Sequence, residues 1–295
     1  MALPSLVPVS TFKLGFTTCA SLSHSKIECV DLNDKKLGVH KVASSTSHKI
    51  VKGPVLKSPC PPLEFPAPTN VWEAVYPKGS YKPSGPIPGG FSFYVGGPTA
   101  FSEGLKTATE VVMSYRMMLQ EGWQWVKGGK LPGVFGGIGD LAYGCSGGRQ
   151  ESRCQCFDLR PMWRGGGDGE LYTYLPLSES NKNRLLAVPP RTIENSDYGF
   201  SVGRGSFCWD IAAGRWVSVA FRVKLNDIGF QNGEVQLWID GVSAMNIDGL
   251  ELRYSKDSTL KGFHFQTFFG GSTAEWASPK EQKAWFADLT GVIIK

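Results

Sequence analysis

Short segments of alternating apolar and polar residues, separated by glycine and proline turns, are the feature that most limits the fold of this chain. The 295 residues include 36 Gly and 19 Pro, which are spread along the chain rather than concentrated in one tract. Because these residues interrupt regular elements and mark tight turns, such a spread favours many short strands over helices. In the run 109–119, Val111, Met113, Tyr115 and Met117 recur at every second position. This alternation predicts a strand with one apolar face.

Further strand-like segments follow at short intervals from Val71 onwards. They are WEAVY, GGFSFYVGG, EGWQWVKGGK, GELYTYLP, GSFCWDI, WVSVAFRVKL, GEVQLWIDG, ELRYS, HFQTFFGG and GVIIK. Trp123, Trp125 and Lys127 are expected to share one face of the EGWQWVKGGK strand. Asn232-Gly233 indicates a hairpin or bulge turn. Ten or more short strands predict an all-β sandwich of the jelly-roll type with a concave cleft.

One short helix is expected near the C-terminus. Ser278 offers an N-cap, Pro279 suits the first helical position and Glu281 completes a capping box. Apolar residues follow at Ala284, Trp285, Phe286 and Leu289. This pattern predicts a helix that begins after Ser278.

The chain divides at residue 68 into two parts of different character. Residues 1–68 form a polar, turn-rich extension that ends in a proline-rich linker, Pro59 to Pro68. Small β-elements are possible at 26–30 or 39–42, and His24, His40 and His48 are interpreted as surface residues. Residues 69–295 form the β-jelly-roll domain, since all-β domains often reach about 200–250 residues.

Composition and charge exclude several classes of protein. The chain is 41% hydrophobic, 12% aromatic and 19% charged, as in globular proteins with a large core. The net charge of +5 comes without a run of Lys or Arg, which argues against binding to nucleic acid. No stretch of about 18 apolar residues is present, so no membrane span is predicted. A local basic cleft would still suit a polyanionic sugar, and we expect a monomer.

The seven cysteines leave at least one without an intrachain partner, since their number is odd. Cys145, Cys154 and Cys156 lie close in sequence around a glycine-rich turn, so Cys145 could pair with either of the other two. A zinc site is a poorer interpretation, because Cys-x-Cys lacks the usual ligand gap and His264 is the one histidine beyond residue 48. No metal and no cofactor are predicted.

The stretch 123–174 holds the candidate chemistry, with lysines, arginines and a Tyr-x-Tyr pair between glycine-rich turns. A 4-linked polyuronate is cleaved by elimination if a cation neutralises the carboxylate, a base removes the C5 proton and an acid protonates the leaving oxygen. Lys127 or Lys130 with Arg160 could supply the cation, and Tyr172 and Tyr174 could move protons. A phenol acts as a base at neutral pH if positive neighbours lower its pKa.

Each of these residues also has a simpler interpretation. Tyrosine on a half-buried strand commonly serves packing, and an exposed lysine or arginine is usually a solvated charge. Trp123, Trp125 and Trp163 could stack on sugar rings or lie in the core.

Several ordered motifs resemble the polysaccharide lyase 14 family, which contains alginate and glucuronan lyases with a β-jelly-roll fold. They are YPKGSY at 76–81, VKGGKLPGVFGG at 126–137, Cys-Phe-x-x-Arg-x-Met-Trp-Arg at 156–164, GELYTY at 169–174 and QTFFGGS at 266–272. The similarity covers about residues 70–295. It implies metal-independent β-elimination with Lys130, Arg160, Tyr172 and Tyr174 as catalytic residues.

One departure from the family pattern concerns Asp158, because the resemblance leads us to expect serine two residues before the arginine. A negative charge there could face the carboxylate of the substrate, or could form a salt bridge with Arg160 or Arg164. Further substrate contacts are expected from residues around the same cleft: Lys127, Asp158, Arg164, Trp125, His264 and Gln266. His264 could equally be a hydrogen-bonded packing residue.

The leading hypothesis is thus a polyuronate lyase, and its substrate would be a glucuronan or alginate-like chain. A jelly-roll lectin that binds acidic carbohydrate without cleaving it is the alternative. The sequence does not determine the cellular compartment. A polymeric substrate favours secretion, but the N-terminus lacks a basic n-region, is interrupted by Pro4, Pro8 and Lys13, and no Asn-x-Ser/Thr sequon is present.

Overall fold

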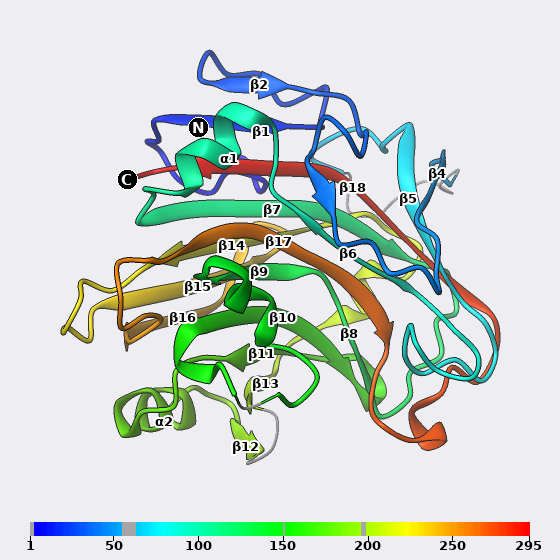
Figure 1. Ribbon diagram of the computed structural model, residues 1–295. Coiled ribbons are helices and arrows are strands. Elements are labelled where there is room, and N and C mark those ends of the chain that lie inside the picture. The colour runs from blue at the N-terminus through cyan, green and yellow to red at the C-terminus, as the bar shows by residue number, and fades with distance from the viewer. Residues whose placement is uncertain (1–2, 55–62, 150, 196–198) are drawn as a thin grey trace.

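Two mostly antiparallel sheets pack face to face as a jelly-roll sandwich (Figure 1). The computed structural model describes residues 3–54, 63–149, 151–195 and 199–295. Cys60 and the first part of the proline cluster lie outside these residues. The predicted all-β jelly roll is confirmed, and along the curved strands of both sheets side chains alternate between the core and the outside (Figure 1).

The hydrogen-bonding order defines each sheet. The first runs β16 (Val242–Leu250), β15 (Gly233–Ile239), β14 (Val217–Lys224), β7 (Glu110–Leu119), β18 (Gln282–Ile293), β1 (Leu14–Thr17) and β2 (Ile27–Cys29), with β5 (Asn70–Tyr76) beside β18 and β4 (Lys49–Lys52) beside β5. The second runs β12 (Ile193–Asn195), β13 (Gly199–Cys208), β11 (Asp168–Tyr174), β10 (Cys156–Arg164), β8 (Gly128–Lys130), β17 (Ser258–Phe269), β6 (Phe91–Val95) and β3 (Val39–His40), with β9 (Gly133–Ile138) also between β10 and β17.

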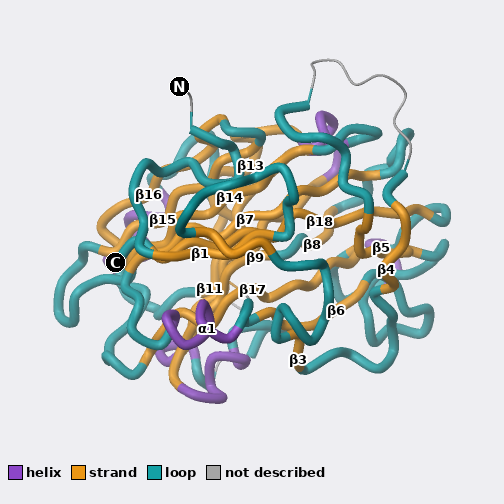
Figure 2. The backbone as a smooth tube through the Cα atoms, turned by 90° about the horizontal axis from the view of Figure 1, so that it is seen from above, coloured by secondary structure: helices purple, strands orange, loops and turns teal. Residues whose placement is uncertain are grey.

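The helices are short and lie at the margins of the strands (Figure 2). They are α1 (Thr99–Leu105) and α2 (Glu179–Leu186). Ser178 caps α2, because its hydroxyl accepts a hydrogen bond from the backbone N–H of Asn181. In the part of the chain that the structure describes, no helix is long and apolar enough to cross a membrane.

The core lies between the sheets and follows the period-2 pattern. On β7, Val111, Met113, Tyr115 and Met117 are all buried in the main hydrophobic cluster, as predicted. Phenylalanines of β6 and β17 face them from the second sheet. The hydroxyl of Tyr115 donates a hydrogen bond to the carbonyl of Pro132 at 2.8 Å, so the core is also pinned by polar contacts.

The N-terminal segment covers the outer face of the first sheet. Leu6, Val7 and Phe12 form a second cluster with Val112 and Val292, which point away from the main core. β1 pairs with β18, and the two ends of the chain lie on the same side of the molecule (Figure 1). This cover explains why every residue of β7 is buried, since both faces of the strand are packed. The elements expected at 26–30 and 39–42 are confirmed as β2 and β3.

The predicted C-terminal helix is wrong, because the segment after Ser278 forms β18. The hydroxyl of Ser278 donates to the carbonyl of Lys280 instead of capping a helix. Buried and half-buried residues alternate from Gln282 to Trp285, and the rest of the strand is buried, with Ala284 and Phe286 in the core. Pairing with β7, β5 and β1 stabilises this strand, and the tertiary context overrides the local capping signals.

The turn predicted at Asn232-Gly233 agrees with the structure in part. Asn232-Gly233 lies where the loop between β14 and β15 enters β15, and a register irregularity follows at Gly233. The tightest hairpin is at Asp240-Gly241, between β15 and β16, where both residues have positive φ (52° and 78°). Two positive φ values are typical of a type I′ turn, for which Asp-Gly is a favoured sequence.

A buried ion pair lies within the first sheet, and its arginine also ties the sheet to the segment that precedes β5. Arg116 of β7 donates to Asp288 of β18 at 2.9 Å and to the carbonyls of Phe65 and Pro66. Both charged side chains are almost fully buried, at 3% and 8% exposure. Removing one partner of such a pair leaves an uncompensated charge in the interior.

We therefore predict that Arg116→Ala lowers the free energy of unfolding by about 3–5 kcal/mol. Urea denaturation measures this change. Lys106→Ala is the control, because Lys106 forms an exposed pair with Glu103 and its loss should cost less than about 0.5 kcal/mol. A loss of under about 1 kcal/mol in Arg116→Ala would show that Arg116 does not anchor the segment that precedes β5.

Candidate functional site

The outer face of the second sheet carries nearly all of the predicted site residues. Alternation along β10 places Leu159 and Trp163 in the core, so Arg160 and Arg164 face outwards. On β11, Leu171 lies in the core and Tyr172 and Tyr174 face outwards, as predicted. The register pairs Arg160 with Tyr172 and Asp158 with Tyr174. Residues far apart in sequence thus meet on one face.

A cavity of about 510 Å³ opens on this face. Six of the predicted residues line it: Lys130, Arg160, Arg164, Tyr172, Tyr174 and Gln266. Lys82 and Arg204 bring the basic side chains of the lining to five, and no carboxylate is among the described residues that line it. A cavity with this excess of positive charge favours an anionic ligand.

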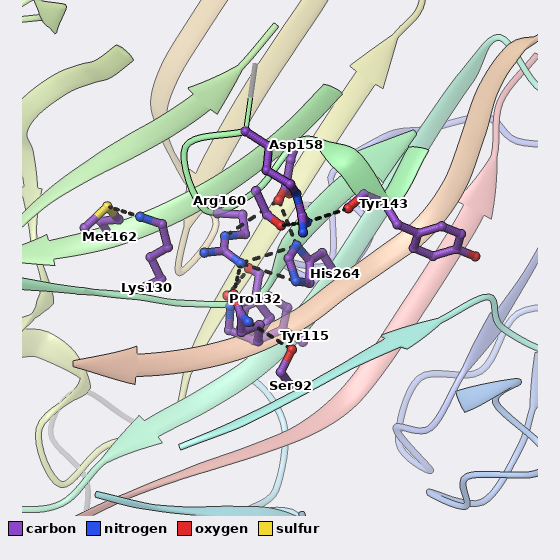
Figure 3. Close-up of polar contacts among 12 residues, drawn as sticks. Ser92, Tyr115, Lys130, Pro132, Tyr143, Asp158, Arg160, Met162 and His264 are labelled. Carbon is purple, nitrogen blue, oxygen red and sulfur yellow. Dashed lines mark hydrogen bonds and ion pairs between the residues drawn. The ribbon is translucent and has the colours of Figure 1, made fainter. Parts of the chain in front are cut away.

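Lys130 lines the cavity from β8, and its amine points towards Met162 of β10 (Figure 3). Its Nζ lies 3.6 Å from Met162 Sδ and 4.3 Å from the centre of the Tyr172 ring. Burial lowers the pKa of Lys130 well below its ordinary value, and the charges of Arg160 and Arg164 lower it further. A lowered pKa makes the neutral amine, which is a base, more accessible at neutral pH.

The two tyrosines lie side by side, with ring centres 5.3 Å apart. Burial raises the pKa of Tyr172 well above its ordinary value, and the neighbouring Tyr174 adds to the rise. Burial also raises the pKa of Tyr174, although Arg160 and Arg153 oppose the rise. The expectation that positive neighbours make these phenols into bases is therefore wrong for the ligand-free protein. Both phenols are protonated and suited to donate protons or hydrogen bonds.

Arg160 lines the cavity and is held in place by hydrogen bonds and ion pairs to buried side chains (Figure 3). Its Nη1 donates to Gln266 Oε1, and its Nε lies 3.8 Å from Asp158 Oδ2. Asp158 in turn accepts a hydrogen bond from His264 Nδ1 at 2.7 Å. Burial lowers the pKa of His264, and Arg160 opposes its protonation as well, although Asp158 acts in the other direction.

Asp158 therefore lies on the same outer face as Arg160, but it is covered by its neighbours and does not reach the cavity. Its side chain is 3% exposed, and neither Asp158 nor His264 is among the residues that line the cavity. Of the two expectations for Asp158, the geometry matches the salt bridge to Arg160. His264 also stacks on Tyr94 with ring centres 4.4 Å apart, which is the arrangement of a hydrogen-bonded packing residue.

Two of the predicted residues lie away from the cavity lining. Lys127 is exposed and forms an ion pair with Glu275. Trp125 is half-buried, and its indole N–H donates to Asp210 at 2.8 Å. The predicted strand through both residues is wrong, because β8 begins at Gly128. Trp123 and Trp163 are core residues.

The disulfide of the site joins Cys145 to Cys156. It closes a loop whose residues Ser146 and Gly147 line the cavity. The sequence left Cys154 and Cys156 as equal alternatives, and the structure selects Cys156, whose side chain is buried whereas Cys154 is exposed. In the same loop, buried Arg153 lies over the ring of Tyr174 at 4.7 Å.

Sequence reasoning missed the part of the lining that comes from β13 and from two segments between strands. Arg204 and Ser201 lie on β13, Trp276 ends a short 3-10 helix, Ala274–Trp276, and Lys82 lies on a loop. Arg204 stands in a glycine-rich run, GFSVGRGSFC, in which apolar alternation is weak. The signal that could have located it is the pairing of β11 with β13, which is a tertiary contact.

Comparison with known proteins agrees with this architecture. The family model for polysaccharide lyase 14 matches residues 66–289. The PL-14 alginate lyase from Aplysia kurodai has 28% sequence identity and a TM-score of 0.73, and the match covers 96% of this chain and 100% of that chain. Alginate lyase vAL-1 from Chlorella virus has 24% identity and a TM-score of 0.65, with coverage of 88% and 93%, and so agrees in fold.

A curated relative, the exolysin of Paramecium bursaria Chlorella virus 1, is 28% identical over 160 residues. The match spans 50% of this chain but 24% of that protein, so the matched half of the chain covers about a quarter of the length of its relative. The family match, in contrast, extends over most of the sandwich and includes every strand that lines the cavity. The chain belongs to the polysaccharide lyase 14 family.

Proposed function

We propose that the chain cleaves a 4-linked acidic polyuronate, of the alginate or glucuronan kind, by β-elimination. The observation that carries this proposal is the cavity in which Lys130, Arg160, Tyr172 and Tyr174 meet without any lining carboxylate among the described residues. A chain with a carboxylate on every sugar complements such a cavity. The alginate lyase of the same fold from Aplysia kurodai supports this substrate class.

Arg160 is the proposed partner of the carboxylate at the reacting sugar. Its Nη1 is engaged with Gln266, and the hydrogen bonds among the described residues leave its Nη2 unused. A guanidinium that contacts this carboxylate stabilises the charge that develops on it when the C5 proton leaves. Asp158 and Gln266 keep the guanidinium in place, so little reorganisation is needed during the reaction.

Lys130 is the proposed base and Tyr172 the proposed acid. The neutral amine of Lys130 takes the C5 proton, the C4–O bond breaks, and its electron pair leaves with the oxygen, which takes the phenolic proton of Tyr172. The products are a C4=C5 double bond at the new non-reducing end and a free hydroxyl on the other fragment. Transfer of the proton from the Lys130 ammonium to the Tyr172 phenolate, through solvent once the products have left, then resets the site.

Tyr174 is the proposed second hydrogen-bond donor of the site. It is protonated, lines the cavity and lies beside Tyr172. Arg153 over its ring favours the development of negative charge on the phenol oxygen. We assign the acid role to Tyr172 because it contacts Lys130 directly.

The reaction itself is tested on a panel of glucuronan, alginate and pectate. We expect ultraviolet absorbance from the unsaturated uronate to rise with at least one of the first two polymers. Retained binding to a uronan, measured by calorimetry, without any absorbance change on the panel would instead support the lectin alternative.

Tyr172→Phe should lower kcat about 10²–10⁴-fold, because the substitution removes the acid and leaves the aromatic ring. Steady-state absorbance assays on the preferred uronan measure this loss. Tyr254→Phe is the matched control, since Tyr254 is an exposed tyrosine outside the cavity lining. Equal activity of Tyr172→Phe and the wild type would refute the acid role.

The Lys130→Arg variant distinguishes two roles of Lys130, that of a base and that of a permanent positive charge. Arginine keeps the positive charge but stays protonated at working pH, so we expect Lys130→Arg to lose about as much activity as Lys130→Ala. In the wild type, kcat/KM should rise with pH as Lys130 loses its proton, and should level off below the ordinary lysine pKa of about 10.4, since the pKa is lowered in the fold.

Lys106→Arg, on the surface, serves as the control for this substitution. A Lys130→Arg variant with near wild-type activity and an unchanged pH profile would assign Lys130 to charge neutralisation alone.

A further inference from the structure

A second basic cluster lies on the same outer face, beyond Lys130 as seen from Arg160. Arg164 of β10 and Arg204 of β13 both line the cavity and converge on Glu170 of β11. Arg164 Nη2 donates to Glu170 Oε1 and Arg204 Nε donates to Glu170 Oε2, each at 2.6 Å. Both guanidinium groups also donate to the hydroxyl of Ser201, at 2.8 and 3.1 Å.

Glu170 is an anchor and not a ligand for substrate. Its side chain is fully buried, and each carboxylate oxygen is engaged by one arginine. Burial acts to raise the pKa of Glu170, but the hydrogen bonds and charges of Arg164 and Arg204 outweigh it and lower the pKa. The carboxylate is therefore ionised, and two arginines around one buried carboxylate leave a net positive charge at the cavity wall.

The two arginines retain unused donors. Nε of Arg164 is buried and has no hydrogen-bond acceptor among the described residues. The bonds to Glu170 and Ser201 engage Nη2 of Arg164 and Nε and Nη2 of Arg204, which leaves Nη1 of each arginine unused within the described part of the chain. An unsatisfied buried donor is costly in the ligand-free protein, so an incoming acceptor would be favoured.

This cluster is set apart from Arg160 along β10. Arg160 and Arg164 lie on the same face of β10, four residues apart, which corresponds to about 13 Å along the strand. Met162 lies between them, beside Lys130. The ring of Trp276 lies 5.9 Å from the Arg164 guanidinium carbon and also lines the cavity, which provides an aromatic surface for a sugar ring.

We propose that Arg164 and Arg204 form a second carboxylate-binding subsite, which holds a uronate unit remote from the scissile bond. This inference rests on the proposed function and specifies its substrate: an uninterrupted run of uronates, so that acid groups reach both Arg160 and the second subsite. Binding of the remote unit then contributes to positioning of the reacting sugar.

Oligouronates of increasing length test the subsite. In the wild type we expect kcat/KM to rise in a step, by about tenfold or more, at the length whose terminal unit first reaches Arg164 and Arg204. Arg204→Ala should reduce this step several-fold. Arg184→Ala is the matched control, because Arg184 forms an exposed pair with Asp248 outside this cavity and should keep the full step.

A second measurement does not depend on the fold of a variant. Oligouronates whose remote carboxylate has been reduced to an alcohol should lose the step in the wild type, because the hydroxymethyl group cannot pair with the arginines. The proposal would be overturned if kcat/KM rose with length as steeply for the reduced oligouronates as for the unreduced ones. The same rise in a folded Arg204→Ala variant would also overturn it.

Failure of the proposed function gives a different result. If the wild type cleaves no oligouronate of any length, calorimetric affinities of the same oligouronates replace kcat/KM. The step in affinity, its loss with reduced oligouronates and its reduction in Arg204→Ala remain the supporting outcome. An affinity that is independent of the remote carboxylate would overturn the subsite itself.

Discussion

The cavity depends on how positive charge is balanced across the second sheet. Five basic side chains line the cavity. The carboxylates that pair with them are buried and do not line it: Asp158 pairs with Arg160, and Glu170 pairs with Arg164 and Arg204. Each buried carboxylate holds its arginines in a fixed orientation. Because no carboxylate is among the described residues of the lining, the cavity has an excess of positive charge that suits a polyanion.

This arrangement also explains the unusual state of Lys130. It lies close to two arginines and has a weak thioether acceptor as its hydrogen-bond partner among the described residues. Burial and like charge disfavour its protonated form, so the residue that appears to be one more cation in the sequence is better suited to act as a base. The same burial keeps Tyr172 and Tyr174 protonated, and the acid and base therefore differ in protonation before substrate arrives.

The sandwich supplies the rigid support that this charge distribution requires. Like charges on neighbouring strands repel each other, and apolar packing on the inner face of the second sheet must offset the free energy of this repulsion. Trp163 and Leu159 of β10 and Leu171 of β11 are fully buried directly beneath the cavity floor. On the far side of the molecule, the N-terminal segment covers the first sheet and buries a surface that would otherwise be exposed, and Arg116 ties the sheet to the segment that precedes β5.

Most strands and the shared face of Tyr172 and Tyr174 were predictable from the sequence, because a period of two places alternate residues on opposite faces whatever the partner strand is. The choice of Lys130 over Lys127 came from the family resemblance and not from this period. The tertiary structure decided which strands are neighbours. Pairing with β7, β5 and β1 made 282–293 a strand despite helix-capping residues, pairing of β11 with β13 brought Arg204 to Glu170, and burial reversed the expected pKa shifts of the tyrosines. Local patterns determine the direction of a side chain, whereas its partners, burial and protonation depend on contacts between residues distant in sequence.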